Sequence, residues 1–175
     1  MTVFDPVAIL GALERRRASY VVVGELAGVI HGSGMTTRTV EITPSLKPEN
    51  LQRIEGALAD LGAAQRQTAP LPQLQLGSEP LAVATDRGEV VLTPTPSGSR
   101  GYDDLRRAAR REPLGRGIRA PVASLPDLIR TIDASAQSGR AQLEQRLRRA
   151  AELERAIEPG LRGPARYLPE SGGYG

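Results

Sequence analysis

The sequence predicts an α/β domain, α+β in its connectivity, in which a small mixed β-sheet is flanked by helices. Residues 20–23 form a continuous apolar run, Tyr-Val-Val-Val, which is typical of a buried strand. Residues 36–43 are rich in β-branched side chains and predict a second strand over 39–43. Residues 48–61 place leucine and isoleucine at helical spacing, which predicts an amphipathic helix.

The ends of the first helices are marked in the sequence. Asp5 and Pro6 suit the N-cap and the first position of a helix, and apolar residues follow at helical spacing. Gly24 ends the first strand, and we expect a short helix over 25–31. Gly62 stands directly after the amphipathic helix, where a glycine suits the C-terminal cap.

The second half of the chain continues the alternation. A β-hairpin is expected over residues 81–94, with its turn at Asp86-Arg87-Gly88. A polar connection containing prolines, residues 63–80, leads into it. The elements expected after the hairpin are a helix over 102–111, a strand over 117–123, a helix that begins at Ser124 and a last helix over about 140–157. The last two elements predict a helical C-terminal part.

Composition narrows the classes of function. The chain has 175 residues and a formal net charge of +3, and its one lysine is Lys47, so the basic charge is almost all arginine. Arginine grips phosphate, but +3 is too small a charge to decide for or against nucleic acid. Aromatic residues make up only 3%, which disfavours binding of single strands by base stacking. The absence of cysteine excludes disulfides and thiolate metal sites.

The sequence also bears on location. No apolar stretch reaches the roughly eighteen residues that a membrane helix needs. We see no basic segment followed by a long apolar run at the N-terminus, which a signal peptide would require. A cytoplasmic protein is therefore expected.

Four short motifs occur in a fixed order from the first strand, through the short helix and the second strand, to the start of the amphipathic helix. They are Val23-Gly24-Glu25-Leu26-Ala27, His31-Gly32, Thr36-Thr37-Arg38-Thr39-Val40-Glu41 and Glu49-Asn50-Leu51. This order resembles the small bacterial nucleotidyltransferases of the polymerase-β-like superfamily, in the group with the minimal and toxin-type enzymes. Weaker matches extend the resemblance over roughly residues 3 to 150. It implies a nucleotidyltransferase fold over residues 1–158, followed by a disordered tail rich in glycine and proline over 159–175.

The resemblance implies a definite chemistry. Nucleotidyl transfer is a phosphoryl transfer in which the protein positions phosphates and neutralises charge through Mg²⁺. In the family a glycine turn offers backbone amides to the triphosphate, and an Asp-x-Asp pair lies on the second strand. Carboxylates two residues apart on a strand share a face and can hold two metal ions together with a third carboxylate nearby.

This chain departs from the family at those positions. Thr39 stands for the first aspartate, Val91 for the third, and only Glu41, at the second, keeps a carboxylate. Glu25 places a negative charge in the glycine turn, where the triphosphate would dock. The family's Arg-Pro-x-Asp-like segment aligns with Arg140-Ala141-Gln142-Leu143, which lacks the proline and the aspartate. We therefore expect a catalytically inactive protein with no metal site, Glu41 being the one candidate ligand.

Three functions stay open at this point. The first is an inactive protein kept for binding a nucleotide or another anion, with Gly24, Glu25, Ser33, Thr37 and Arg38 as candidate contacts, or for binding a partner protein. The second is an active transferase, with Mg²⁺ as its cofactor, in which Glu25, Glu89 or Asp86 joins Glu41. The third is a basic nucleic-acid-binding module on arginine-rich faces such as the predicted helix end with Arg106, Arg107, Arg110 and Arg111. His31, the only histidine, is a structural or substrate-facing position.

Overall fold

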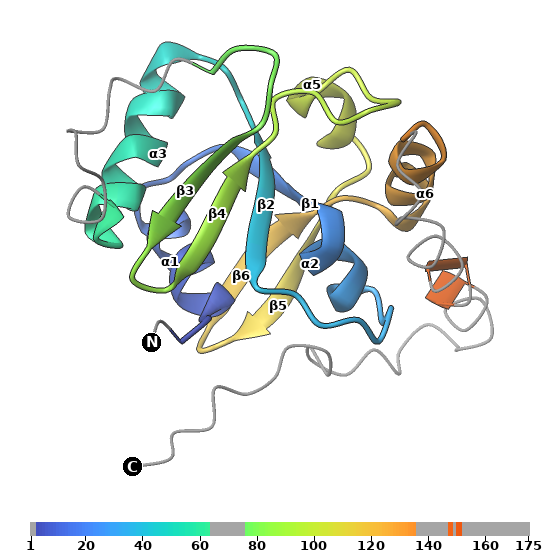
Figure 1. Cartoon of the computed structure of the whole chain (residues 1–175), viewed down its shortest axis with the longest axis horizontal. Helices are drawn as coiled ribbons and strands as arrows, with labels where there is room; N and C mark the ends of the chain where they lie inside the picture. Colours follow the sequence, from blue (N-terminus) through green and yellow to red (C-terminus); the bar gives the residue numbers. More distant parts are fainter. Residues whose placement is uncertain (1–2, 64–75, 136–146, 149, 152–175) are drawn as a thin grey trace.

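The computed structural model describes residues 3–63, 76–135, 147–148 and 150–151 of the chain. Its centre is a six-stranded sheet with the strand order β3-β4-β2-β1-β6-β5 (Figure 1). The strands are β1 (Tyr20–Val23), β2 (Thr39–Pro44), β3 (Leu81–Thr85), β4 (Gly88–Leu92), β5 (Arg110–Gly115) and β6 (Ile118–Val122). The helices are α1 (Pro6–Arg15), α2 (Gly24–Ile30), α3 (Pro48–Asp60), α5 (Tyr102–Leu105) and α6 (Leu125–Asp133).

The sheet is mixed, as the sequence predicted. Strand β1 runs antiparallel to β2 and parallel to β6, and β2 runs parallel to β4. Two antiparallel hairpins, β3–β4 and β5–β6, form the two ends of the sheet. The predicted hairpin over 81–94 is confirmed as β3 and β4.

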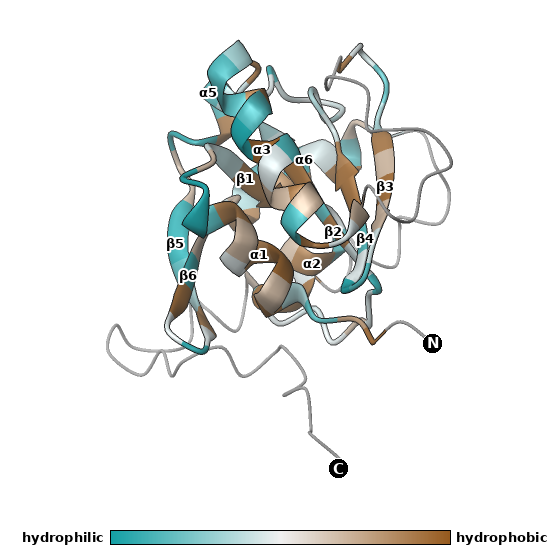
Figure 2. Cartoon of the chain, turned by 90° about the vertical axis from the view of Figure 1, so that its left-hand side faces the viewer, coloured by the Kyte–Doolittle hydropathy of each residue, from teal (hydrophilic) through white to brown (hydrophobic). Residues whose placement is uncertain are grey.

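Helices α1 and α2 lie on opposite faces of this sheet (Figure 1). The Tyr20 hydroxyl on β1 donates a 2.9 Å hydrogen bond to Glu14 of α1, so the face that carries Tyr20 is the α1 face. Apolar side chains fill the space between this face of the sheet and the helices that cover it. Figure 2 shows hydrophobic segments along these strands and helices. Its fully buried members include Ile9, Leu10, Leu13, Val22, Val40, Ile42, Ile54, Leu58, Val90 and Leu92.

The predicted ends of α1 and α3 are confirmed. Asp5 is the N-cap of α1, and its Oδ1 accepts a 3.0 Å hydrogen bond from the Ala8 amide. Helix α3 ends at Asp60, and Gly62 follows with a φ of +79°, a left-handed conformation that glycine adopts without steric cost.

The predicted helix over 102–111 is wrong in its second half. Helix α5 ends at Leu105, and Arg110 begins β5, a strand the sequence analysis did not predict. Strand β5 pairs with β6 through a turn in which Arg116 and Gly117 both have positive φ, +49° and +73°. Positive φ at both central residues is the usual geometry of a tight hairpin turn, but Arg-Gly is a weaker signal for it than Asn-Gly.

Some predictions fall outside the described residues. They include most of the helix over 140–157, the segment Arg140-Ala141-Gln142-Leu143, the tail over 159–175 and much of the connection over 63–80. Residues 147, 148, 150 and 151 are helical, and Arg148 forms a 3.2 Å ion pair with Asp133 of α6. Within the described residues, the structure has no helix that is long and apolar enough to cross a membrane.

Candidate functional site

The candidate catalytic residues lie on the α2 face of the sheet, at neighbouring positions of β2 and β4. Glu41 pairs with Val23 of β1 on one side and with Val91 of β4 on the other. Thr39 pairs with Glu89 in the same parallel ladder. Paired residues point to the same face, and so do residues two apart on a strand. The register therefore gathers Thr39, Glu41, Glu89 and Val91 into one patch.

This patch continues onto β3 as an open surface. Ala82 pairs with Val91 and Ala84 pairs with Glu89, and both alanines are exposed. Glu89 is exposed as well, whereas Glu41 and Val91 are half-buried. The β2–β4–β3 half of this face is accessible in the described part of the chain, as a site for a large substrate requires.

Both oxygens of the Glu41 carboxylate lie against other residues of the protein. The Thr93 hydroxyl, just beyond β4, donates a 2.7 Å hydrogen bond to Glu41 Oε1. Oε2 lies against the glycine turn, since a Cβ added to Gly24 would stand 2.1 Å from it. Gly24 also has a φ of +66°, so both its backbone conformation and its close approach to Glu41 require glycine.

The residues of the patch do not fit the pair of Mg²⁺ ions that the family resemblance implies. Mg²⁺ takes hard oxygen ligands in a tight octahedron. Directly beside Glu41 stands Val91, which has no ligand atom, and two residues before it stands Thr39, a neutral hydroxyl. No group of three or more His, Asp or Glu side chains that could hold a metal ion occurs among the described residues.

The glycine turn is negatively charged. Glu25 is exposed in the first turn of α2, directly after Gly24, against which the Glu41 carboxylate lies. A triphosphate at this turn would meet two carboxylates, and like charges about 4 Å apart repel by roughly 1 kcal/mol even in water.

The loop before β2 uses its hydroxyls internally. Ser33 is buried, and its Oγ accepts a 3.3 Å hydrogen bond from the Met35 amide. Thr37 Oγ1 accepts from the Thr39 amide and donates to the Thr39 carbonyl oxygen, both at 3.2 Å. Of the three loop residues expected to contact an anion, only Arg38 presents an exposed side chain.

Asp86 lies apart from this patch. A Cβ added to Gly62, just beyond α3, would stand 2.0 Å from Asp86 Oδ2. The carboxylate is thus directed to the end of α3. Of the three carboxylates expected to join Glu41, the register brings Glu89 to its face and chain connectivity brings Glu25 close, whereas Asp86 faces another element.

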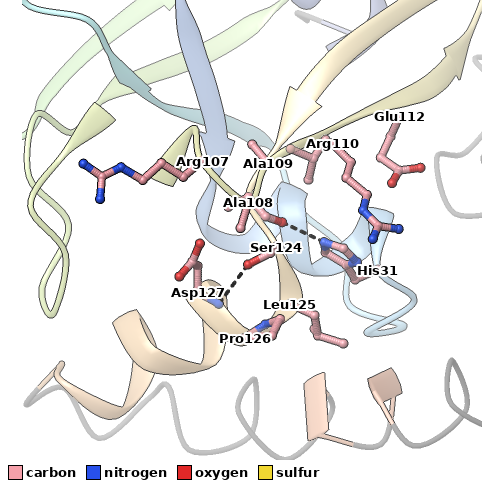
Figure 3. A pocket seen from close by; sticks show the side chains of 12 residues that line it. His31, Arg107, Ala108, Ala109, Arg110, Glu112, Ser124, Leu125, Pro126 and Asp127 are labelled. Carbon is pink, nitrogen blue, oxygen red and sulfur yellow. Dashed lines mark hydrogen bonds between the residues drawn. The ribbon is translucent and has the colours of Figure 1, made fainter. Parts of the chain in front are cut away.

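His31 ends α2 and ties it to the end of β6. Its Nε2 lies 2.8 Å from the Ala123 carbonyl oxygen (Figure 3). A carbonyl oxygen only accepts, so Nε2 carries the hydrogen and donates it. The ring also lines a cavity, together with Arg107, Arg110 and the start of α6.

Two functional or structural partners escaped the sequence analysis. Thr93 was not singled out, although it lies two residues beyond Val91 and so on the same face as Glu41. Asn50 was noted only as part of a motif. Its side chain accepts from the Ser19 amide at 2.6 Å and donates to the carbonyl oxygens of Ser19 and Ser45, both at 2.8 Å.

Comparisons with known proteins agree with this geometry at the level of the fold. No protein-family model and no curated protein matches the sequence. Among solved structures, the chain is similar to the crystal structure of a "putative nucleotidyltransferase" from Thermotoga maritima, with a TM-score of 0.51 and 18% sequence identity. The match covers 83% of this chain and 89% of that chain. The chain therefore has a nucleotidyltransferase fold.

Proposed function

We propose that this chain is a catalytically inactive nucleotidyltransferase-fold protein that is retained for binding, either of a nucleotide or another anion or of a partner protein. The observation that carries the proposal is the pairing of Glu41 with Val91 across β2 and β4. It places a side chain without a ligand atom directly beside Glu41, where a two-metal site needs a further carboxylate.

The environment of Glu41 supports the same proposal. Its two oxygens contact Thr93 and the Gly24 turn, so the carboxylate belongs to an internal contact. A ligand that needs Mg²⁺ between its phosphates and the protein has little to bind here. We expect the protein to act in the cytoplasm as a binding protein. The toxin-type nucleotidyltransferases that the sequence resembles tend to occur with a partner protein, which supports a protein ligand.

An active transferase with a rearranged carboxylate site is the second candidate. It is favoured by one observation, the parallel register that places exposed Glu89 opposite Thr39 on the face of Glu41. In that case Glu41 and Glu89 would act together as the metal ligands.

One assay separates the two candidates. Pyrophosphate release is measured with Mg²⁺ and each nucleoside triphosphate, for the wild type, Glu41→Gln and Glu89→Gln. The inactive-protein proposal expects the same background signal from all three proteins. Turnover by the wild type that falls to background in both variants would establish the second candidate instead.

A further inference from the structure

Strand β3 forms one edge of the sheet (Figure 1). Its sequence, Leu-Ala-Val-Ala-Thr, contains no charged residue and no proline, and its register with β4 is unbroken. Leu81, its first residue, is one of the three exposed large apolar side chains of the described residues. An edge strand of this kind can hydrogen-bond to a further strand.

The opposite edge, β5, is protected against such pairing. It carries three charged residues, Arg110, Arg111 and Glu112. Pro113 lacks the N–H that a ladder requires, and the register with β6 shifts between Pro113 and Gly115. Charges, proline and an irregular register are the features that keep an edge strand unpaired. The contrast singles out β3 as the edge that can accept a further strand.

The backbone groups of Ala82 and Ala84 are directed away from the sheet. The β3–β4 turn closes between Thr85 and Gly88, so Thr85 directs its N–H and C=O toward β4. The direction alternates along a strand, so the N–H and C=O groups of the two alanines point outward. No loop or turn of the described residues hydrogen-bonds to either alanine, and both are exposed. These groups can therefore form a new ladder.

A second copy of β3 fits this edge in one antiparallel register. With Val83 opposite Val83 of the second copy, Ala82 lies opposite Ala84 of the second copy, and the two exchange both hydrogen bonds. The two-fold symmetry repeats this exchange. Only shifts by two residues keep each side chain on its face. Such a shift brings either Pro80, which has no N–H, or Asp86, which lies in the turn, opposite an alanine.

Two exposed charges of opposite sign flank β3. Glu79 precedes the strand, and Arg87 lies in the turn that follows it. Neither forms an ion pair with another of the described residues. The register centred on Val83 brings Glu79 of each copy beside Arg87 of the other. Asp86, the second charge of the turn, is directed to the end of α3 instead.

The pairing also keeps the same face of both sheets on one side. Paired residues point to one face of a sheet, so the two-fold axis of such a dimer is perpendicular to the sheet. Ala82 and Ala84 lie on the face that carries Glu41 and Val91. The open α2 faces of the two copies would therefore form one continuous surface.

We propose that this chain forms a symmetric dimer in which β3 pairs with β3 of a second copy, so that the two six-stranded sheets become one. A second copy is the occupant because one register uses the outward groups of both alanines and also brings Glu79 beside Arg87. The proposal goes beyond the proposed function and does not depend on it, since the new ladder involves neither Glu41 nor Val91.

The test is sedimentation velocity of the full-length protein over a series of concentrations, with hydrogen exchange of the Ala82 and Ala84 amides followed by NMR. Glu79→Arg and Arg87→Glu each place like charges beside one another at both ends of the ladder. The double variant restores opposite charges in exchanged positions. Arg107→Glu makes the same charge change as Arg87→Glu at an exposed arginine outside β3 and serves as the matched control.

A dimer should form, and exchange of both alanine amides should slow as the protein concentration rises. Each single charge reversal should raise the Kd of the dimer by about tenfold or more, and the double variant should recover most of the affinity. Arg107→Glu should leave the Kd unchanged. Ala84→Pro, which removes an outward N–H at an edge position that accepts proline, should abolish the dimer. Thermal unfolding verifies that each variant is folded.

Three results would overturn the proposal: a monomer at every concentration, a dimer that a folded Ala84→Pro variant retains, or single charge reversals that the double variant does not rescue. A monomer that binds a strand of another protein at this edge also overturns the second copy as its occupant. If Ala84→Pro does not fold, the charge reversals and their rescue decide alone. Turnover in the pyrophosphate assay contradicts the proposed inactivity, whereas a monomer contradicts only the β3 interface.

Discussion

Thr93 Oγ1 donates a 2.7 Å hydrogen bond to Glu41 Oε1, so the carboxylate on β2 is bound by a residue that directly follows the neighbouring strand β4. The other oxygen, Oε2, lies against the backbone of Gly24. These two contacts give Glu41 a structural role at the position where the family resemblance implies a metal ligand.

Gly24→Ala should destabilise the protein more than a matched substitution elsewhere. Gly24 and Gly34 have nearly the same φ, +66° and +69°, so alanine costs about 1–2 kcal/mol in either place because of its Cβ. At Gly24 the new Cβ would also displace the Glu41 carboxylate, whereas at Gly34 it meets nothing within 4 Å. Urea unfolding of both variants measures the difference.

A double substitution tests whether the extra cost of Gly24→Ala comes from the contact with Glu41. In the Glu41→Ala background, Gly24→Ala should cost no more than Gly34→Ala, because the displaced carboxylate is gone. Equal costs of the two glycine substitutions in the wild-type background would show that Glu41 is not packed against the turn.

Asp5 should make stability depend on pH in the acid range. Burial alone would raise the pKa of Asp5, but hydrogen bonds from Arg116 and from the Ala8 amide outweigh it and leave the pKa below its ordinary value. A carboxyl with a lowered folded-state pKa stabilises the protein above its unfolded-state pKa of about 3.9, and this stability is lost as the pH falls through the folded-state pKa.

Two substitutions separate the contributions of Asp5. Asp5→Ala removes the helix cap and the ion pair and should cost about 1–2 kcal/mol at neutral pH. Asp5→Asn keeps a good cap, so it should cost less. Its deficit relative to the wild type should stay constant above about pH 5 and shrink below about pH 4. A deficit of Asp5→Asn that does not change with pH in urea unfolding would refute the role of the Arg116 pair.

Asn50 should be the most sensitive polar residue of α3. It is 3% exposed, and its side chain satisfies an amide and two carbonyl groups of the segments before β1 and after β2. Asn50→Ala leaves these groups without their partner and should lower the free energy of unfolding by about 3 kcal/mol. Gln52→Ala, at an exposed position of the same helix, should change it by less than about 0.5 kcal/mol.

Nucleic acid should not bind strongly to the arginine-rich faces. Of the arginines predicted to form one basic helix end, Arg106 and Arg111 are neutralised by Asp103 and Glu14, and Arg110 and Arg111 lie on a strand instead. We expect no gel shift with tRNA even at low salt. A shift at low salt that disappears steeply at high salt would favour the nucleic-acid-binding module.

The sequence was sufficient for most of the fold because its elements carry local signals. The apolar run that became β1, the capped start of α1 and the glycine after α3 each depend on a few neighbouring residues. Strand β5 could not be found in this way. It contains Pro113 and two exposed arginines, and its place is set by pairing with β6, a tertiary contact.

The candidate site was predictable in its composition but less so in its contacts. Thr39, Glu41 and Val91 were aligned from motif order, and the register shows only that they lie on one face, with Val91 opposite Glu41. The hydrogen bond from Thr93 depends on the parallel pairing of β2 with β4, which no local pattern encodes. The cavity beside His31 was missed since it joins α2, β5, β6 and α6, elements far apart in the chain.

The most direct test of the central claim is calorimetric titration of the protein with ATP in the presence and absence of Mg²⁺. Thr39→Asp/Val91→Asp, which introduces carboxylates beside Glu41, serves as the positive control. The proposal of an inactive site predicts that Mg²⁺ does not change ATP binding by the wild type and that the double variant gains Mg²⁺-dependent binding. Tight Mg²⁺-dependent binding of ATP by the wild type, abolished by Glu41→Gln, would contradict it.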